Sequence, residues 1–273
     1  MRRFRRPNRR DFPLYAGASV FKREGPARDL RANALLAAHL AATAGFVNSG
    51  GFVMIGSFTS HVTGSVGRFA NDLANAHFAA SFAALWLVLA FYGGAVAASL
   101  LLEQKDSPLL PARYALALAV EAGLLLTFVF VAGLSRTSHP LLLDAQALFL
   151  CAAMGMQNSL VTRLSGAVVR TTHLTGVLTD LGIETARWLR FHQKRVLSGP
   201  PSLRERPAAD RIWLLATIFV SFVIGAAIGA VMTARISRWA MCLPAAAVGL
   251  ASLFAFVQGS PAHSVRPPPA RRP

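Results

Sequence analysis

Two short polar blocks carry the residue types best suited to chemistry in this sequence. The first block runs Thr59-Ser60-His61-Val62-Thr63-Gly64, and the second runs Thr171-Thr172-His173-Leu174-Thr175-Gly176. Each block combines hydroxyl groups and an imidazole with a glycine, which permits an irregular backbone. Such a segment could be a broken helix or a re-entrant loop that contacts a solute or a proton. It could equally be an interfacial loop that caps the next helix. The sequence leaves both interpretations open.

An asparagine precedes each block, inside the adjoining apolar run. Asn48 lies before the first block and Asn158 before the second. A buried amide in lipid needs hydrogen-bond partners, so each asparagine either joins helices or belongs to a site. The predicted solute-binding residues are Asn48, Thr59, His61, Thr63, Asn158, Thr171, His173 and Thr175.

Glu121 is the residue that stands out most within an apolar run. An acidic side chain well inside a membrane helix is costly and is a functional candidate by default. Counted from the start of its own run, His39 has a similar depth, about 10 Å into the membrane. We therefore consider Glu121 and His39 as a proton relay, with a structural hydrogen bond between helices as the alternative.

The elements that must position these residues are long apolar segments. The chain has 273 residues, of which 54% are hydrophobic and only 15% are charged. This composition argues against a soluble globular protein, a disordered chain and a coiled coil. Six runs reach the length that a spanning helix needs. They are residues 33–57, 78–102, 114–133, 141–162, 212–234 and 239–258. The sequence thus predicts an all-α polytopic membrane protein with six transmembrane helices.

An internal repeat divides the chain. The two His-containing blocks match each other, and two further pairs of segments also match. The segment Gly45-Phe46-Val47-Asn48-Ser49 is similar to Gly155-Met156-Gln157-Asn158-Ser159. The segment Phe91-Tyr92-Gly93-Gly94-Ala95 is similar to Phe222-Val223-Ile224-Gly225-Ala226. The matches occur in the same order, which predicts repeats over 33–133 and 141–258. Three helices per repeat is an odd number, so the second repeat should enter the membrane from the opposite side. The small residues in these matches predict close helix packing.

The basic residues indicate an orientation. With six spans and a cytoplasmic N-terminus, all but four of the 28 Lys and Arg residues lie on the inner side. The predicted cytoplasmic parts are a basic tail (1–32), a basic loop (185–211) and a Pro/Arg-rich tail (259–273). Segments 58–77, 134–140 and 235–238 are expected outside. The basic loop should lie near anionic lipid headgroups and should not bind nucleic acid.

Three of these segments resemble a known family. The Ser60-His61-Val62-Thr63-Gly64 segment, the Gly155–Ser159 segment and the Arg170–Asp180 segment are similar to the YoaK family of bacterial inner-membrane proteins. The resemblance covers roughly residues 30–260, and the Arg170–Asp180 segment is its most specific part. It implies a six-helix protein of the bacterial inner membrane and no established activity.

These features favour a small secondary-transporter-like permease for an unknown small solute, with a polar site between the repeats. The alternatives are a structural or regulatory membrane protein and a membrane-integral enzyme that acts on a lipid-like substrate. The sequence has no nucleotide-binding, hydrolase or zinc motif, so we expect neither an enzyme nor a cofactor nor a metal. The expected partners are the lipid bilayer, the solute and a second copy in a homodimer.

Overall fold

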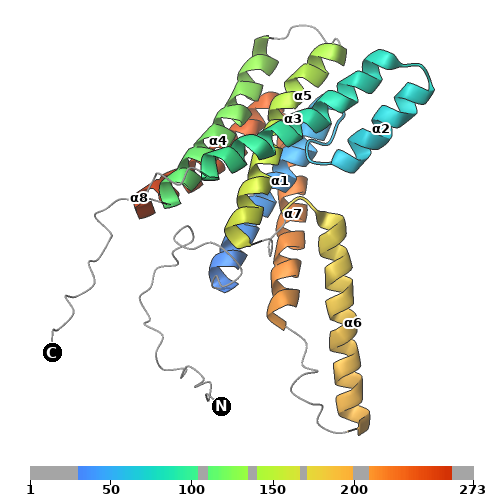
Figure 1. Cartoon of the computed structure of the whole chain (residues 1–273), viewed down its shortest axis with the longest axis vertical. Helices are drawn as coiled ribbons and strands as arrows, with labels where there is room; N and C mark the ends of the chain where they lie inside the picture. The colour runs from blue at the N-terminus through green and yellow to red at the C-terminus, as the bar shows by residue number, and fades with distance from the viewer. Residues whose placement is uncertain (1–29, 104–109, 135–139, 167–170, 199–208, 260–273) are drawn as a thin grey trace, which may run out of the picture.

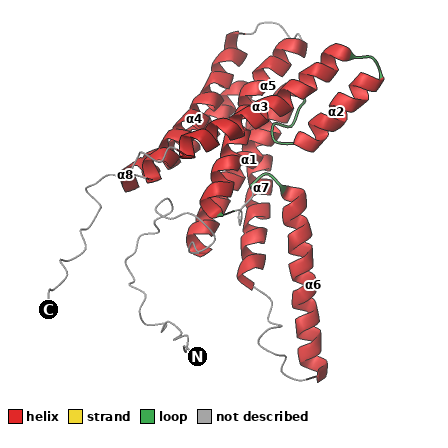
Figure 2. Ribbon diagram, viewed as in Figure 1, coloured by secondary structure: helices red, strands yellow, loops and turns green. Residues whose placement is uncertain are grey.

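The computed structural model describes residues 30–103, 110–134, 140–166, 171–198 and 209–259. Regular secondary structure in these ranges is helical (Figure 2). The elements are α1 (Leu30–Ile55), α2 (Val62–Ala74), α3 (Phe78–Glu103), α4 (Leu110–Leu134), α5 (Pro140–Ser165), α6 (Leu174–Ser198), α7 (Ala209–Ile236), the 3-10 helix η2 (Ser237–Met241) and α8 (Cys242–Gly259). The two predicted tails and the predicted outer segment 134–140 lie almost entirely outside the described residues.

Within the described residues, four stretches are long and apolar enough to cross a membrane. They are Ala34–Ile55, Phe78–Glu103, Pro111–Leu134 and Ala209–Gln258, and the last comprises α7, η2 and α8. The chain is therefore a multi-pass membrane protein. α5 is less apolar because it carries buried polar side chains, including Gln146 and Gln157. Polar side chains within membrane helices usually face the interior of the helix bundle. The count of six spanning helices stays a prediction.

Two helices lie where the sequence predicted only loops. α2 occupies most of the predicted outer segment 58–77, and α6 extends through the first half of the predicted basic loop 185–211. Both were missed because their composition is more polar than that of the spans. α2 buries none of its residues, and in α6 only Val177 and Glu184 are buried among the described side chains. Because neither segment forms a long apolar run, the sequence of each resembles that of a loop.

The helices pack in reciprocal pairs. α1 packs against α7, α3 against α5, and α4 against α8, while α2 lies along α3 and α6 along α7 (Figure 1). α6 extends beyond the end of α7, as Figure 1 shows. The core lies where α1, α4, α5, α7 and α8 meet. Its largest fully buried side chains include Tyr114, Phe128, Leu40, Met154 and Ile218.

Glycines bring the paired helices into backbone contact. A Cβ atom on Gly45 of α1 would overlap the carbonyl oxygen of Phe222 in α7, and one on Gly155 of α5 would overlap the carbonyl oxygen of Phe91 in α3. The reciprocal approaches are Gly225 to Ala42 and Gly94 to Ala152. The prediction that these small residues form close-packing faces is confirmed.

Candidate functional site

The first polar block lies at the break between α1 and α2. Oδ1 of Asn48 accepts hydrogen bonds from the backbone N–H of Ser60 at 3.1 Å and from its hydroxyl at 3.0 Å. Asn48 is part of α1, and Ser60 is in the connection that leads to α2. The amide therefore ties the connecting segment to the helix that precedes it.

The second polar block has the equivalent contact at the break between α5 and α6. The hydroxyl of Thr172 donates to Oδ1 of Asn158 at 2.6 Å. In the described residues, Nδ2 of Asn158 has no hydrogen-bond partner. Both asparagines predicted as site residues thus contact the His-containing blocks, and each holds the chain where one helix stops and the next begins.

Each block also buries one threonine. Thr59 is 2% exposed and Thr171 is fully buried. The Cγ2 methyl of Thr59 lies close to Gly51 of α1, where an added Cβ would be 2.7 Å away. Among the described side chains, neither threonine hydroxyl has a hydrogen-bond partner. Two equivalent buried hydroxyls therefore lie beside the two helix breaks.

The two histidines have equivalent positions at the helix starts. His61 is the N-cap residue of α2 and His173 directly precedes α6. An added Cβ on Gly64 would overlap the His61 ring, and one on Gly176 would lie 2.5 Å from Nδ1 of His173. Each imidazole thus folds over the glycine three residues further on. The His61 side chain makes no capping hydrogen bond to α2.

A cleft of about 730 Å³ lies between α6 and α7. It brings together His173 and Thr175, two of the predicted site residues, while His61 and Thr63 do not line it. The other lining residues are Gly176, Val177, Thr179, Asp180, Arg211, Leu214, Leu215 and Ile218. One wall is thus largely polar and comes from α6, whereas the α7 wall is apolar apart from Arg211.

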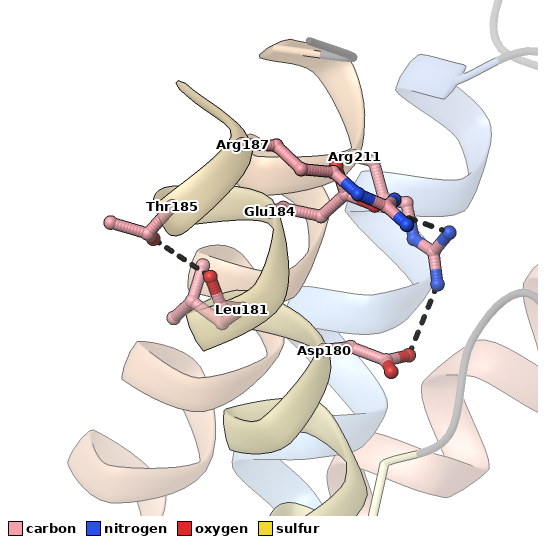
Figure 3. A network of polar contacts seen from close by, with 6 residues as sticks. All are labelled: Asp180, Leu181, Glu184, Thr185, Arg187 and Arg211. Atoms are coloured by element: carbon pink, nitrogen blue, oxygen red, sulfur yellow. Dashed lines mark hydrogen bonds and ion pairs between the residues drawn. The ribbon is translucent and has the colours of Figure 1, made fainter. Parts of the chain in front are cut away.

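An ion-pair network borders this cleft (Figure 3). Arg211 of α7 lies between two acidic residues of α6, with Nη2 3.1 Å from Oδ2 of Asp180 and Nη1 3.4 Å from Oε1 of Glu184. Arg187 approaches the same Glu184 oxygen at 2.9 Å. The Glu184 side chain is 5% exposed, whereas those of Asp180 and Arg211 are about half exposed. The buried carboxylate therefore has two cationic partners, as burial of a charge requires.

Arg211 corrects one expectation from the sequence. It was predicted to lie in the basic loop 185–211, but it belongs to α7 and joins that helix to α6. Its expected position near the lipid headgroups stays a prediction. The network was missed because its members come from two elements, one of which was taken for a loop. The spacing of Asp180 and Glu184, one helical turn apart, is the signal that could have revealed a shared acidic face.

Glu121 is fully buried on α4. Both of its carboxylate oxygens lack a hydrogen-bond partner among the described residues. The predicted hydrogen-bonded pair with His39 is therefore not formed. His39 lies instead in an apolar groove of about 370 Å³ between α1 and α8, beside Ala247 and Phe254.

Other polar atoms lie in the same core. Nε2 of Gln157 donates to the carbonyl oxygen of Leu40 at 2.7 Å and links α5 to α1. Its Oε1 has no partner among the residues that the structure describes. Over the same ranges, no three His, Cys, Asp or Glu side chains are grouped closely enough to hold a metal ion.

Comparison with known proteins gives a family and no activity. No curated protein and no solved structure matches the chain significantly. A family model described as a protein of unknown function (DUF1275) matches residues 36–254, which include both polar blocks and the α6–α7 cleft. The resemblance to YoaK-like proteins is thereby confirmed, and the chain belongs to the DUF1275 family of membrane proteins.

Proposed function

We propose that this protein is a small secondary-transporter-like permease of the bacterial inner membrane, which moves a small solute and performs no chemical conversion. The observation that carries the proposal is the pair of equivalent helix breaks. Asn48 holds the break after α1, and Asn158 holds the break after α5. Interrupted helices in two inverted repeats are how many secondary transporters build a solute site.

The proposal includes two inverted three-span repeats, formed by α1, α3 and α4 and by α5, α7 and α8. The reciprocal glycine contacts support it, because Gly45 approaches Phe222 in the other half just as Gly155 approaches Phe91. α2 and α6 are then the shorter helices that follow each break. The proposed orientation has both termini in the cytoplasm, as the distribution of Lys and Arg favours. The six-span size favours a homodimer as the working assembly.

Proton coupling is the proposed role of Glu121, with His39 as a further relay candidate. An ionised carboxylate that is buried without a partner is strongly disfavoured, so the neutral form fits this position. A carboxyl group that changes its protonation state when the surrounding helices move could couple a proton to the solute. The full burial of Glu121 supports this role.

Uptake by the purified full-length chain in proteoliposomes tests the proposal. Small radiolabelled amino acids, carboxylates, phosphate and sugars are compared with protein-free vesicles, with and without an imposed pH gradient. At least one solute should accumulate faster when the protein is present. His61→Ala and His173→Ala should each abolish that uptake with little change in melting temperature, while His77→Ala, an exposed histidine outside both blocks, should leave it unchanged.

The opposite result has a clear meaning. If no solute enters faster than in protein-free vesicles, the structural or regulatory alternative takes the place of the permease. If uptake occurs but neither block histidine affects it, the two His-containing blocks are not the solute site.

A further inference from the structure

The α6–α7 cleft has two walls of opposite character. α6 contributes Thr175 and the carboxylate of Asp180, and α7 contributes Leu214 and Ile218. Arg211 is the cationic group of the α7 wall. The cleft therefore offers one anionic group, one cationic group and an apolar surface to the same bound molecule.

The two ion pairs of Arg211, with Asp180 and with Glu184, differ in how easily they can be broken. Glu184 is buried, so loss of its cationic partners would leave an uncompensated charge away from water. Asp180 is about half exposed, and an ion pair between exposed side chains contributes little stability. Arg211 is thus held in place by Glu184, while its contact with Asp180 can open at small cost.

We propose that the cleft binds a small zwitterion of the amino-acid class that carries an apolar side chain. The carboxylate of the ligand takes the place of Asp180 on Arg211, and its ammonium group pairs with the freed Asp180 carboxylate. The apolar side chain lies on Leu214, Leu215 and Ile218, and Thr175 offers a hydroxyl beside the charged groups. The inference deepens the proposed function and rests on it only for the consequence that the bound solute crosses the membrane.

The charges in the cleft favour a zwitterion over a simple anion. A simple anion on Arg211 would leave the displaced Asp180 carboxylate without a cationic partner in the cleft, whereas a zwitterion supplies one. The ligand therefore replaces one ion pair with two, and each new pair includes a charge-assisted hydrogen bond. Both charges of the ligand should consequently be required.

Binding of L-leucine to the full-length chain in nanodiscs of phosphatidylglycerol tests the inference by calorimetry. The competitors are 4-methylpentanoate, which lacks the amine, and 3-methylbutylamine, which lacks the carboxylate. Leucine should bind about ten to a hundred times more tightly than either, because each competitor loses one charged contact. Equal binding of leucine and 4-methylpentanoate would show a simple anion site and overturn the inference.

Two variants, each with a matched control, test whether leucine contacts Asp180 and Arg211. Asp180→Asn should weaken leucine binding about ten- to a hundredfold while the Arg211–Glu184 pair remains. Arg211→Gln should weaken leucine binding at least as much, but it leaves Glu184 with one partner fewer and can lower stability. Asp210→Asn and Arg190→Gln remove exposed charges that do not line the cleft, so they should bind leucine normally. Unchanged leucine binding in Asp180→Asn would overturn the inference.

An ethanolamine phospholipid headgroup also pairs an anionic group with an ammonium group. Glycerophosphoethanolamine is therefore added as a further competitor in the same nanodiscs, whose lipid contains no ammonium. If it binds and leucine does not, the occupant is a lipid headgroup and the amino-acid assignment fails. Leucine binding without leucine uptake would support the cleft inference and contradict the permease. Uptake of another solute without leucine binding would contradict the cleft inference alone.

Discussion

Gly45 of α1 lies against the carbonyl oxygen of Phe222 in α7, with no room for a side chain between the two helices. Gly155 of α5 has the same relationship to Phe91 of α3. Each contact joins the first helix of one half of the chain to a helix of the other half. The two halves are therefore held together by two equivalent glycine contacts. A larger residue at either glycine should lower the stability of the fold by a similar amount.

Gly45→Ala and Gly155→Ala should each destabilise the fold. The new Cβ must displace the backbone of the neighbouring helix, and overpacking of this kind costs about 1–3 kcal/mol. The melting temperature in detergent should fall by about 2–4 °C for each kcal/mol. Gly123→Ala on α4 is the matched control, because nothing lies within 4 Å of its added Cβ. If all three variants have the same melting temperature, the glycine contacts do not stabilise the packing of the two halves.

The two asparagine contacts should differ in strength. Ser60→Ala removes one donor to Asn48 but leaves the backbone N–H of residue 60 in place. Thr172→Val removes the hydroxyl donor to Asn158 and leaves a partly buried acceptor without this partner, which costs about 1–3 kcal/mol where the acceptor stays unpaired. Thr172→Val should therefore lower the melting temperature more than Ser60→Ala. An equal loss would show that the hydroxyl of Thr172 contributes no more than that of Ser60.

Hydropathy and the internal repeat predicted several of the long helices and their close-packing residues. The predicted runs 78–102 and 141–162 nearly coincide with α3 and α5, although no candidate span is found within the described part of α5. The repeat also predicted which small residues pack closely. It could not predict which helices they meet, because a close-packing face on one helix does not specify its partner.

The site was harder to predict for a physical reason. His173 and Thr175 were identified from the repeated block, and both line the α6–α7 cleft. Asp180 and Arg211 come together only because α6 is a helix antiparallel to α7 (Figure 1). The polar residues interspersed along α6 kept it from standing out as an apolar run in the sequence. The expected hydrogen bond between Glu121 and His39 is not formed, because similar depth along two helices does not bring their side chains together. Their role as a proton relay stays a prediction.

The proposed orientation can be tested by labelling single cysteines. Ala74→Cys, at the exposed end of α2, should react with a membrane-impermeant maleimide in intact bacterial cells. Arg190→Cys on α6 should react only after the cells are permeabilised, because the basic residues favour a cytoplasmic side. The native Cys151 and Cys242 are both free thiols and are replaced by alanine in this background. The reverse labelling pattern would invert the proposed topology.

Glu121→Gln tests whether the buried carboxyl group serves proton coupling or packing. Glutamine keeps the shape of the side chain and removes the titrating proton, so the melting temperature should stay the same or rise. Counterflow of a solute identified in the uptake screen should persist, while acceleration by a pH gradient should disappear, because no proton can bind at this position. Glu103→Gln is the control, since this acidic residue is exposed and pairs with Arg163 at 3.2 Å. A pH-gradient response that survives in Glu121→Gln would remove Glu121 from the coupling mechanism. A melting temperature several degrees lower would instead show that the carboxyl group has a structural partner that the amide cannot replace.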